Sequence, residues 1–365
     1  MLKKLLQTTK SFLSKNPKLK YFIQSIIPAG FLKNISTKAQ NQYSKFESFY
    51  TDDLEIKFSL GPLEDTRGIG RVAKEQYSFL LSKNVDKKEI IKDKVHFYTS
   101  IHWAPKELPE DSIIMIHDVI PMVFPDIFKE AYKQWSTDFY DVAHKASHII
   151  TISQTSKDDI IKYLDIDAKK ISIVNNGVTK LTPSEKVNLK LPDKYFVYIG
   201  SYDLHKNLDI ILEALTHEEC STYNLVMIGD NLHSIEKVKK LNLQDRVFFL
   251  GKVDDNDMAY IVQNSMALLF PSLYEGFGLP PMEAALLHIP SICSTRPTMS
   301  EFLYDVSLFA DPYNSKEWAI QMQKMEKYPN LREKLADLSY ERISSFTWQK
   351  SCENLLLSLA SNRSI

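Results

Sequence analysis

The feature that most constrains the fold of this chain is a repeated alternation of short apolar runs with stretches of helical periodicity. Five such runs precede residue 179 and five more follow residue 193. Apolar strands that alternate with helices form parallel sheets covered by helices, which predicts an α/β protein. The predicted strands are residues 55–60, 95–98, 113–116, 148–152 and 171–174, then 195–199, 225–228, 247–250, 266–270 and 289–293.

A polar stretch divides the two series. Residues 179–193 contain Pro183 and Pro192 and show no periodicity, which is typical of a linker. A chain of 365 residues is also too long for a single hydrophobic core. We therefore expect a first domain over residues 47–182, a linker over 183–193, a second domain over 194–346 and a final helix over 347–361.

Composition excludes several classes of protein. A net charge of −1 gives no support for a nucleic-acid partner. The three cysteines, Cys220, Cys293 and Cys352, lack Cys-x-x-Cys spacing, which indicates buried thiols in a reducing compartment rather than a zinc site or disulfides. No apolar run approaches the roughly 20 residues that span a bilayer, and no secretory signal is evident. A cytoplasmic location is expected.

The N-terminal segment, residues 1–46, is basic and amphipathic. It contains nine lysines and no acidic residue, and its leucines and phenylalanines recur at helical spacing. This pattern is typical of helices that lie on anionic lipid, so residues 1–35 are predicted to contact the inner face of a membrane as a peripheral anchor. The alternatives are a solvated tail and a helix packed on the first domain.

The segment that most clearly predicts a ligand-binding site is residues 271–285, Pro-Ser-Leu-Tyr-Glu-Gly-Phe-Gly-Leu-Pro-Pro-Met-Glu-Ala-Ala. It leaves a buried strand, forms a glycine loop and enters a helix opened by two prolines. Gly276 and Gly278 let a ligand approach the main chain, and the first helical turn offers unpaired N–H groups to an anion. Glu275 and Glu283 flank this anion site, where carboxylates can bind sugar hydroxyls. The plainer alternatives are a simple turn and a helix-dipole preference for Glu.

The E-x7-E arrangement with Gly-Phe-Gly-Leu-Pro inside it resembles the signature of family 4 of the retaining glycosyltransferases. That resemblance implies the GT-B fold, two facing Rossmann-like doubly wound domains around a cleft, with the final helix returning to the first domain. It also implies that Glu275 contacts the donor sugar and Glu283 the ribose. The loop amides expected to bind the sugar and diphosphate belong to Gly276, Phe277, Gly278 and Leu279.

The segment Gly-Ser-Tyr-Asp-Leu-His-Lys-Asn, residues 200–207, resembles the family's Gly-x-x-x-x-Arg-Lys-Asn. A fixed cation stabilises the charge that develops on a leaving diphosphate, and Lys206 is our candidate for it. Gly200 and His205 are assigned to donor binding, although His205 replaces a basic residue and an imidazole is only partly protonated near neutral pH. A solvated lysine is the alternative.

Two further segments are predicted to bind the donor. Residues 68–73, Gly-Ile-Gly-Arg-Val-Ala, match a dinucleotide pattern, but the first glycine lies too far past the strand. Gly-Ile-Gly-Arg instead resembles the glycine-rich loop of the first GT-B domain, so Gly68 and Gly70 are expected to close over the diphosphate or sugar. A plain helix start is the alternative. Residues 246–253 resemble the segment beneath the nucleoside, so Gly251 and Val253 are expected to contact the base.

The first domain is expected to form the other wall of the cleft, facing the donor-binding residues of the second domain. His117 follows a buried strand directly, and the family has a histidine at the matching position near the donor sugar. Asp118 is expected to orient its imidazole, and Asp118 and His102 are predicted to lie on the acceptor side. Glu301 stands where the family commonly has Pro-Glu, but here Met299-Ser precedes it, which leaves its role open.

Neither a metal nor a cofactor is predicted. The predicted substrate is a nucleotide-diphosphate sugar. Asp165 and Asp167 imitate a D-x-D metal motif, but they lie in a polar loop away from the carboxyl ends of the strands and are interpreted as a turn.

These expectations define a retaining, metal-independent hexosyltransferase, with Lys206, Glu275 and His117 as its catalytic residues. Its partners would be the nucleotide sugar and a carbohydrate or lipid-linked glycan in cell-surface polysaccharide or lipopolysaccharide assembly. One alternative is a transferase for a small soluble acceptor, such as a sucrose- or trehalose-type synthase. Another is a non-catalytic nucleotide-sugar-binding protein, which the substitution at His205 favours.

Overall fold

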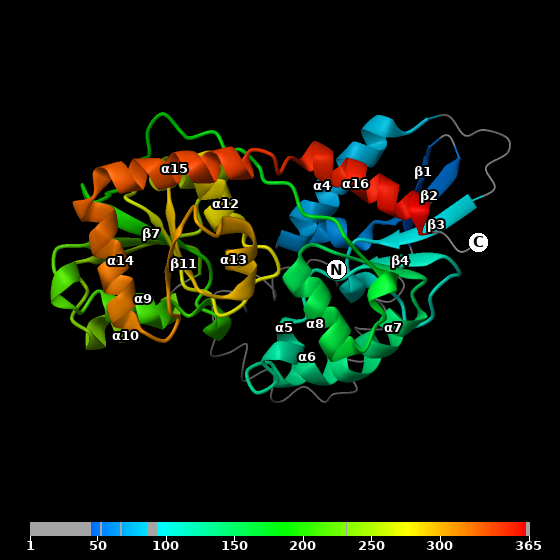
Figure 1. Ribbon diagram of the computed structural model, residues 1–365, viewed down its shortest axis with the longest axis horizontal. Helices are drawn as coiled ribbons and strands as arrows, with labels where there is room; N and C mark the ends of the chain where they lie inside the picture. The colour runs from blue at the N-terminus through cyan, green and yellow to red at the C-terminus, as the bar shows by residue number, and fades with distance from the viewer. Residues whose placement is uncertain (1–44, 52, 66–67, 86–92, 231, 363–365) are drawn as a thin grey trace, which may run out of the picture.

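The computed structural model describes residues 45–51, 53–65, 68–85, 93–230 and 232–362. Over these residues the chain forms two lobes side by side, which two stretches of chain connect (Figure 1). The predicted membrane contact of residues 1–35 lies outside the described residues. Within the described part, no helix combines the length and the apolar character needed to cross a bilayer.

The first domain is built on a six-stranded sheet whose strands follow chain order, β1-β2-β3-β4-β5-β6. β1 pairs antiparallel with β2, and the other neighbours are parallel. The strands are β1 (Phe46–Tyr50), β2 (Leu54–Ser59), β3 (Asp93–Tyr98), β4 (Ser112–Met115), β5 (His148–Thr151) and β6 (Ile171–Ile173). The helices and helical turns are η1 (Gly61–Glu64), α4 (Gly68–Lys83), η2 (Ile101–Trp103), α5 (Ile120–Val123), α6 (Lys129–Gln134), the π-helical η3 (Trp135–Phe139), α7 (Tyr140–Lys145), α8 (Gln154–Leu164), η4 (Ala168–Lys170) and the C-terminal α16 (Trp348–Ser361).

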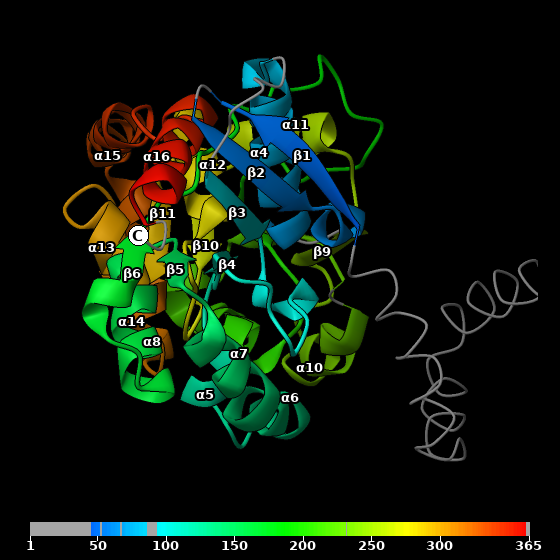
Figure 2. The same cartoon turned by 90° about the vertical axis from the view of Figure 1, so that its right-hand side faces the viewer.

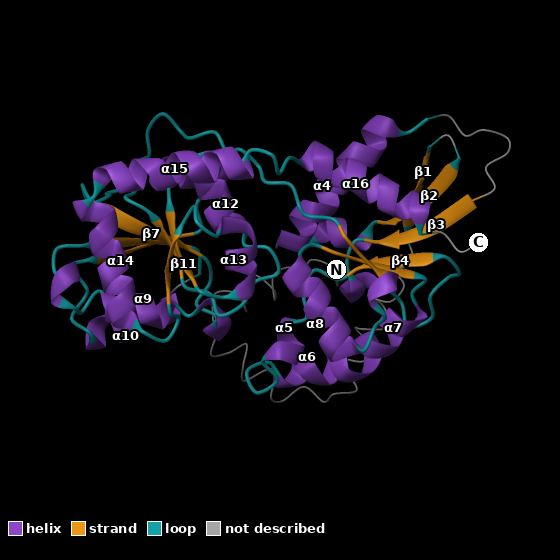
Figure 3. Cartoon of the chain, viewed as in Figure 1, coloured by secondary structure: helices purple, strands orange, loops and turns teal. Residues whose placement is uncertain are grey.

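Helices cover both faces of this sheet (Figure 3). Successive side chains of a strand point to opposite faces, so a strand buried on both faces is apolar throughout. In β4, Ile113 and Met115 pack in the cluster that includes Val72 and Leu80 of α4, whereas Ile114 packs in the cluster that includes Val142 of α7. This two-sided burial explains why the strands are continuous apolar runs in the sequence.

The second domain has a six-stranded parallel sheet in the order β12-β11-β10-β7-β8-β9. Its strands are β7 (Tyr195–Ile199), β8 (Asn224–Ile228), β9 (Val247–Gly251), β10 (Leu268–Phe270), β11 (Ser291–Ser294) and β12 (Leu308–Ala310). Its helices are η5 (Leu204–Lys206), α9 (Leu208–Ala214), η6 (Glu218–Cys220), η7 (Leu232–Ser234), α10 (Ile235–Lys240), α11 (Asp255–Gln263), α12 (Leu279–Leu286), α13 (Pro297–Leu303), α14 (Ser315–Lys327) and α15 (Pro329–Ile343). All three cysteines are buried and free, as predicted.

Two strands were not predicted from the sequence, β1 and β12. β1 lies at the edge of its sheet with one buried residue, Phe49, so its apolar pattern is weak. β12 has only three residues. Each strand extends an edge of its sheet and leaves the predicted parallel strands in place.

The C-terminal helix α16 lies on the first domain beside α4 (Figures 1 and 2). Its start is fixed to the end of the first domain, because Trp348 Nε1 donates to Thr179 Oγ1 at 2.9 Å and the Val178 N–H donates to the Phe346 carbonyl at 2.8 Å. A Cβ atom built on Gly177 would lie only 2.4 Å from the backbone nitrogen of Trp348. Gly177 therefore permits the close crossing of the two chain segments that join the lobes.

We expect Gly177→Ala to destabilise the fold, because the added methyl group must push the start of α16 away from the first domain. Overpacking of this kind costs roughly 1–3 kcal/mol of the free energy of unfolding. Urea unfolding of the variant and the wild type measures the difference. Gly68→Ala is the matched control, since a Cβ atom at Gly68 has no neighbour within 4 Å; equal stability of all three proteins would contradict the expectation.

Candidate functional site

The order of the second sheet reverses between β10 and β7, which are paired neighbours although β8 and β9 separate them along the chain. Ligands of open α/β sheets bind beyond the carboxyl ends of the strands at such a reversal. The loop after β7 leads to Lys206, and the loop after β10 leads to Glu275. The topology therefore places the two predicted catalytic residues of the second domain at the point where a ligand is expected.

These two residues form an ion pair. Lys206 Nζ lies 2.7 Å from Glu275 Oε1, and their side chains are only 23% and 13% exposed. The Leu273 N–H donates to the His205 carbonyl at 2.7 Å, and Thr298 Oγ1 donates to the Glu275 carbonyl at 2.5 Å. Both loops are thus fixed to each other and to α13.

The loop from Gly276 to Gly278 presents main chain rather than side chains. Gly278 has φ +85° at the start of α12, where a Cβ atom would meet Met299 Cε at 2.2 Å. The Phe277 ring packs against Phe302, with ring centroids 4.7 Å apart, and lies in the hydrophobic core. The main-chain N–H groups of this loop and of Leu279, the first residue of α12, are of the kind that binds an anion at a helix start.

Glu283 is paired with the first domain. It is 7% exposed, and its Oε1 accepts a hydrogen bond from Arg71 Nη1 of α4. Arg71 Nη2 also lies 3.2 Å from Asp255 Oδ2 of α11. Burial raises the pKa of Glu283 to about 7, although the Arg71 guanidinium opposes the shift. The carboxylate predicted to bind the ribose is therefore held by an arginine of the Gly-Ile-Gly-Arg segment across the domain interface.

His117 lies at the same interface. A Cβ atom on Gly276 would lie 2.8 Å from the His117 carbonyl oxygen, so the glycine loop reaches the carboxyl end of β4. The His117 Nε2 lies 2.8 Å from the Thr99 carbonyl, which fixes the ring with Nε2–H as the donor. Asp118 Oδ1 accepts the N–H of Ile120 at 3.1 Å.

His205 contributes no cation. Its ring lies 5.6 Å from that of Phe128 in the first domain. Burial, followed by the charge of Lys206, lowers the pKa of His205 below its ordinary value of 6.5, so its imidazole is mainly neutral at pH 7. Lys206 is the cation that this segment supplies.

The remaining predicted donor residues are glycines and one valine. Gly68 and Gly70 open α4, one turn or less from Arg71, and Gly70 packs on the Asp65 carbonyl, where a Cβ atom would lie 1.9 Å away. Gly251 ends β9 with φ +67° and leaves open space beside its Cα.

Gly200, at the end of β7, packs over Tyr198 Oη, 2.9 Å from the position of a Cβ atom. Val253 is partly buried against the core. His102 is exposed in η2 and lies edge-on to Trp135 and Phe139 of η3, so the residue assigned to the acceptor side packs on two buried aromatic rings.

Among the described residues, no group of three or more His, Cys, Asp or Glu side chains could hold a metal ion. Asp165 ends α8 with φ 52°, and Asp167 Oδ1 accepts the Lys169 N–H at 2.8 Å. The D-x-D sequence is a turn, as predicted.

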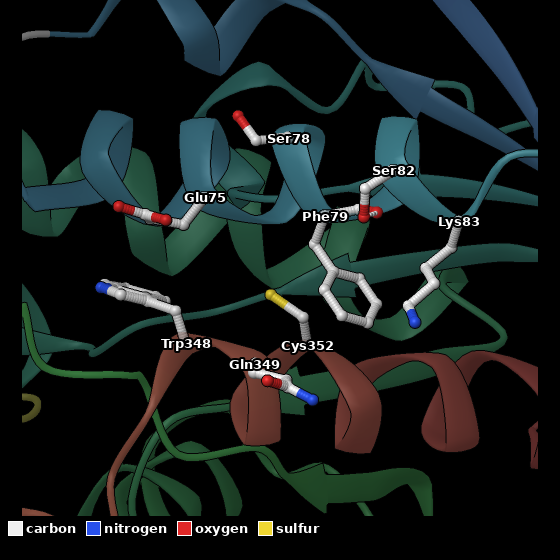
Figure 4. A pocket seen from close by; sticks show the side chains of 8 residues that line it. All are labelled: Glu75, Ser78, Phe79, Ser82, Lys83, Trp348, Gln349 and Cys352. Atoms are coloured by element: carbon white, nitrogen blue, oxygen red, sulfur yellow. Dashed lines mark hydrogen bonds between the residues drawn. The ribbon is translucent and has the colours of Figure 1, made fainter.

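A separate pocket of about 430 Å³ lies between α4 and α16 (Figure 4). Its lining includes Phe79, Trp348 and Cys352, and burial raises the pKa of the Cys352 thiol to about 12. None of the predicted site residues lines it.

Sequence reasoning missed the interdomain contacts of the site. Arg71 lies in a motif that the sequence analysis identified, yet its pairing with Glu283 spans 212 residues and has no local signature. Thr298 and Tyr274 were also missed; Tyr274 directly precedes Glu275, and its hydroxyl donates to Asp159 Oδ2 of α8.

Comparison with known proteins relates this architecture to sugar transfer. Residues 180–342 match the family model described as "Glycosyl transferases group 1". The chain is 31% identical over 237 residues to O-antigen chain mannosyltransferase RfbU of Salmonella typhimurium, which covers 64% of this chain and 65% of that protein. It is 25% identical over 271 residues to O-antigen chain mannosyltransferase B of Escherichia coli, covering 68% and 69%. The match thus spans slightly less than two thirds of the Salmonella relative.

Solved structures show the same fold. Anabaena Alr3699/HepE, in complex with UDP and glucose, superposes with a TM-score of 0.64 at 17% identity, covering 81% of this chain and 84% of that one. Sucrose-phosphate synthase from Thermosynechococcus elongatus gives a TM-score of 0.64 at 18% identity, covering 73% of each chain. The predicted GT-B fold is confirmed.

The raised pKa of Glu283 predicts a pH dependence of stability. An unfolded glutamate has a pKa of about 4.3, so between about pH 4 and pH 7 the folded state binds more protons than the unfolded state. The free energy of unfolding should therefore fall as pH rises through this window, and Glu283→Gln should flatten that slope. Urea unfolding at several pH values measures it. Glu107→Gln, at an 88% exposed side chain, is the control; an unchanged slope in Glu283→Gln would refute the expectation.

Proposed function

We propose that the chain transfers a hexose, mannose or a similar sugar, from a nucleotide-diphosphate donor to a saccharide acceptor, in agreement with the match of residues 180–342 to the group 1 glycosyl transferases. The observation that carries this proposal is the Lys206–Glu275 ion pair at the strand-order reversal of the second sheet, beside a glycine loop that opens α12. This arrangement offers a cation, main-chain N–H groups and a carboxylate to one ligand.

We assign the donor groups as follows. The diphosphate binds at the N–H groups of residues 276–279 and at Lys206, because a helix start and a fixed cation both favour negative charge. Glu275 accepts hydrogen bonds from sugar hydroxyls. Glu283 accepts them from the ribose once the donor has displaced Arg71 from it. Arg71, which also pairs with Asp255, then approaches the diphosphate from the first domain.

The reaction is proposed to retain the anomeric configuration. The acceptor oxygen forms a bond to the anomeric carbon on the face from which the diphosphate departs, while the bond from that carbon to the diphosphate oxygen breaks. The acceptor proton passes to the departing diphosphate. Lys206 and the loop amides stabilise the negative charge that grows on the leaving group, and His117 positions the sugar from the opposite wall.

No metal is required in this proposal, because Lys206 and the start of α12 supply the positive charge that the leaving diphosphate needs. Turnover should therefore survive chelation by EDTA. A loss of turnover that added Mg²⁺ or Mn²⁺ restores would overturn this part of the proposal.

The acceptor is proposed to be a growing cell-surface polysaccharide. The support comes from two relatives whose names state an O-antigen chain mannosyltransferase. A lipid-linked acceptor would suit the basic residues 1–35, which we propose to lie on the cytoplasmic membrane surface. Co-sedimentation with anionic vesicles tests that location.

Lys206→Ala should lower donor turnover by roughly 10²- to 10³-fold, because removal of one fixed charge at a developing anion has effects of this size. The assay follows release of nucleoside diphosphate from GDP-, UDP- and ADP-sugars, with and without saccharide acceptors. Lys237→Ala is the matched control, since this lysine pairs with Asp209 and Glu213 within the same domain. Wild-type protein that binds nucleotides but releases none would favour a non-catalytic binding protein.

The nucleotide itself can be identified by thermal shift. A ligand that binds only the folded state raises the melting temperature as its concentration exceeds Kd. We expect one of GDP, UDP and ADP to stabilise the protein, and Gly278→Ala to lose that effect, because its added methyl group collides with Met299 and displaces the loop. No shift with any of the three would contradict the donor assignment.

A further inference from the structure

Helix α8 of the first domain is contacted by two side chains of the second domain. Glu301 of α13 binds its start: Oε1 accepts the Gln154 N–H at 2.8 Å, and Oε2 accepts the Thr155 N–H at 3.0 Å and the Thr155 hydroxyl at 2.9 Å. One turn further along, Asp159 Oδ2 accepts the Tyr274 hydroxyl at 2.5 Å. We propose that Tyr274 and Glu301 are positioning residues, which set the first domain against the donor loop through α8.

The Tyr274 contact bears directly on the site. Tyr274 precedes Glu275 in the chain, so its hydrogen bond fixes the carboxylate-bearing loop to α8. The other end of this linkage is His117, because Ser156 Oγ of α8 donates to the His117 carbonyl at 2.9 Å. That same carbonyl faces Gly276. Helix α8 therefore connects the main chain at His117 to the main chain at Glu275.

Because it is buried, the hydrogen bond from Tyr274 to Asp159 contributes more than the bonds from Glu301 to the start of α8. The Tyr274 side chain is 7% exposed, and its ring lies edge-on to Phe124 of the first domain, with ring centroids 6.4 Å apart. Burial also raises the pKa of the Asp159 carboxyl above its ordinary value. Glu301 is exposed, so its bonds to the start of α8 compete with water and contribute less.

The consequence for catalysis rests on the proposed function. Most of the proposed diphosphate contacts, Lys206 and the N–H groups of residues 276–279, belong to the second domain, so loss of the α8 contacts should leave nucleotide affinity nearly unchanged. Transfer needs the sugar to be held between Glu275 and His117, and a displacement of about 1 Å in such a geometry can cost about 100-fold in rate. Loss of the α8 contacts should therefore lower the turnover rate without weakening nucleotide binding.

The test is Tyr274→Phe, which removes the hydroxyl and keeps the ring. We expect kcat to fall roughly 10- to 100-fold, with the Kd of the stabilising nucleotide within about twofold of the wild type. Asp159→Ala should have the same effect, and Asp159→Asn, which keeps an acceptor oxygen, should restore most of the activity. The double variant Tyr274→Phe with Asp159→Ala should be no worse than either single variant, because both remove one interaction.

Tyr223→Phe is the matched control, since the Tyr223 hydroxyl donates to Glu326 at 3.2 Å within the second domain. Three results would overturn the proposal: full turnover in Tyr274→Phe, a parallel loss of nucleotide binding, or additive losses in the double variant. Melting temperatures of all variants identify any that fail to fold, and Glu301→Ala, at an exposed residue, then serves as the second probe.

A measurement independent of turnover separates this proposal from the function itself. In Glu301→Ala, hydrogen exchange of the Gln154 and Thr155 amides should accelerate several-fold, because both lose their acceptor. Asp158→Ala, which removes only a contact to Gln154 on the same helix, is the control. Unchanged exchange rates would refute the α8 contact. If the wild type transferred no sugar, the proposed function would be wrong. The exchange experiment would still test whether Glu301 binds the start of α8.

Discussion

Two carboxylates with little access to water, each paired with one cation, are the constraint on which the rest of the site depends. Glu275 is paired with Lys206 inside the second domain, and Glu283 is paired with Arg71 across the interface. A buried carboxylate without a partner costs several kcal/mol, so the loop conformation and the approach of the domains persist together. In the proposed function, the hydroxyl groups and phosphates of the donor become new partners for the same side chains.

The alternation of apolar runs and helical periods was sufficient to predict two parallel-sheet domains, because strands buried on both faces are apolar at every position. It could not predict β1, in which only Phe49 is buried, or the three-residue β12. Strand order was also out of reach, because no local pattern records which strands become neighbours. The reversal between β7 and β10 is therefore information that only the structure supplies, and it places Lys206 beside Glu275.

The candidate residues of the second domain followed from a family resemblance centred on residues 271–285, and the structure pairs two of them, Lys206 and Glu275, beside the glycine loop. The contacts between domains could not be predicted. Arg71 and Glu283 are separated by 212 residues, and Tyr274 and Asp159 by 115, so neither pair leaves a trace in sequence spacing. The burial of individual side chains could not be predicted either. The sequence left the charge of His205 open, and its burial beside Phe128 lowers the pKa of the imidazole, which is mainly neutral at pH 7.

The inward direction of the Phe277 ring has an evolutionary consequence. With that ring in the core and a glycine on either side, the loop offers a ligand only peptide groups, which every amino acid carries. A change of side chain cannot remove a peptide N–H, except by proline, so a substitution disturbs these groups only where it moves the main chain, as a methyl group at Gly276 or Gly278 would. Under the proposed function, substitutions of the surrounding side chains can change the sugar or base that is bound, while the N–H groups proposed to bind the phosphates stay the same.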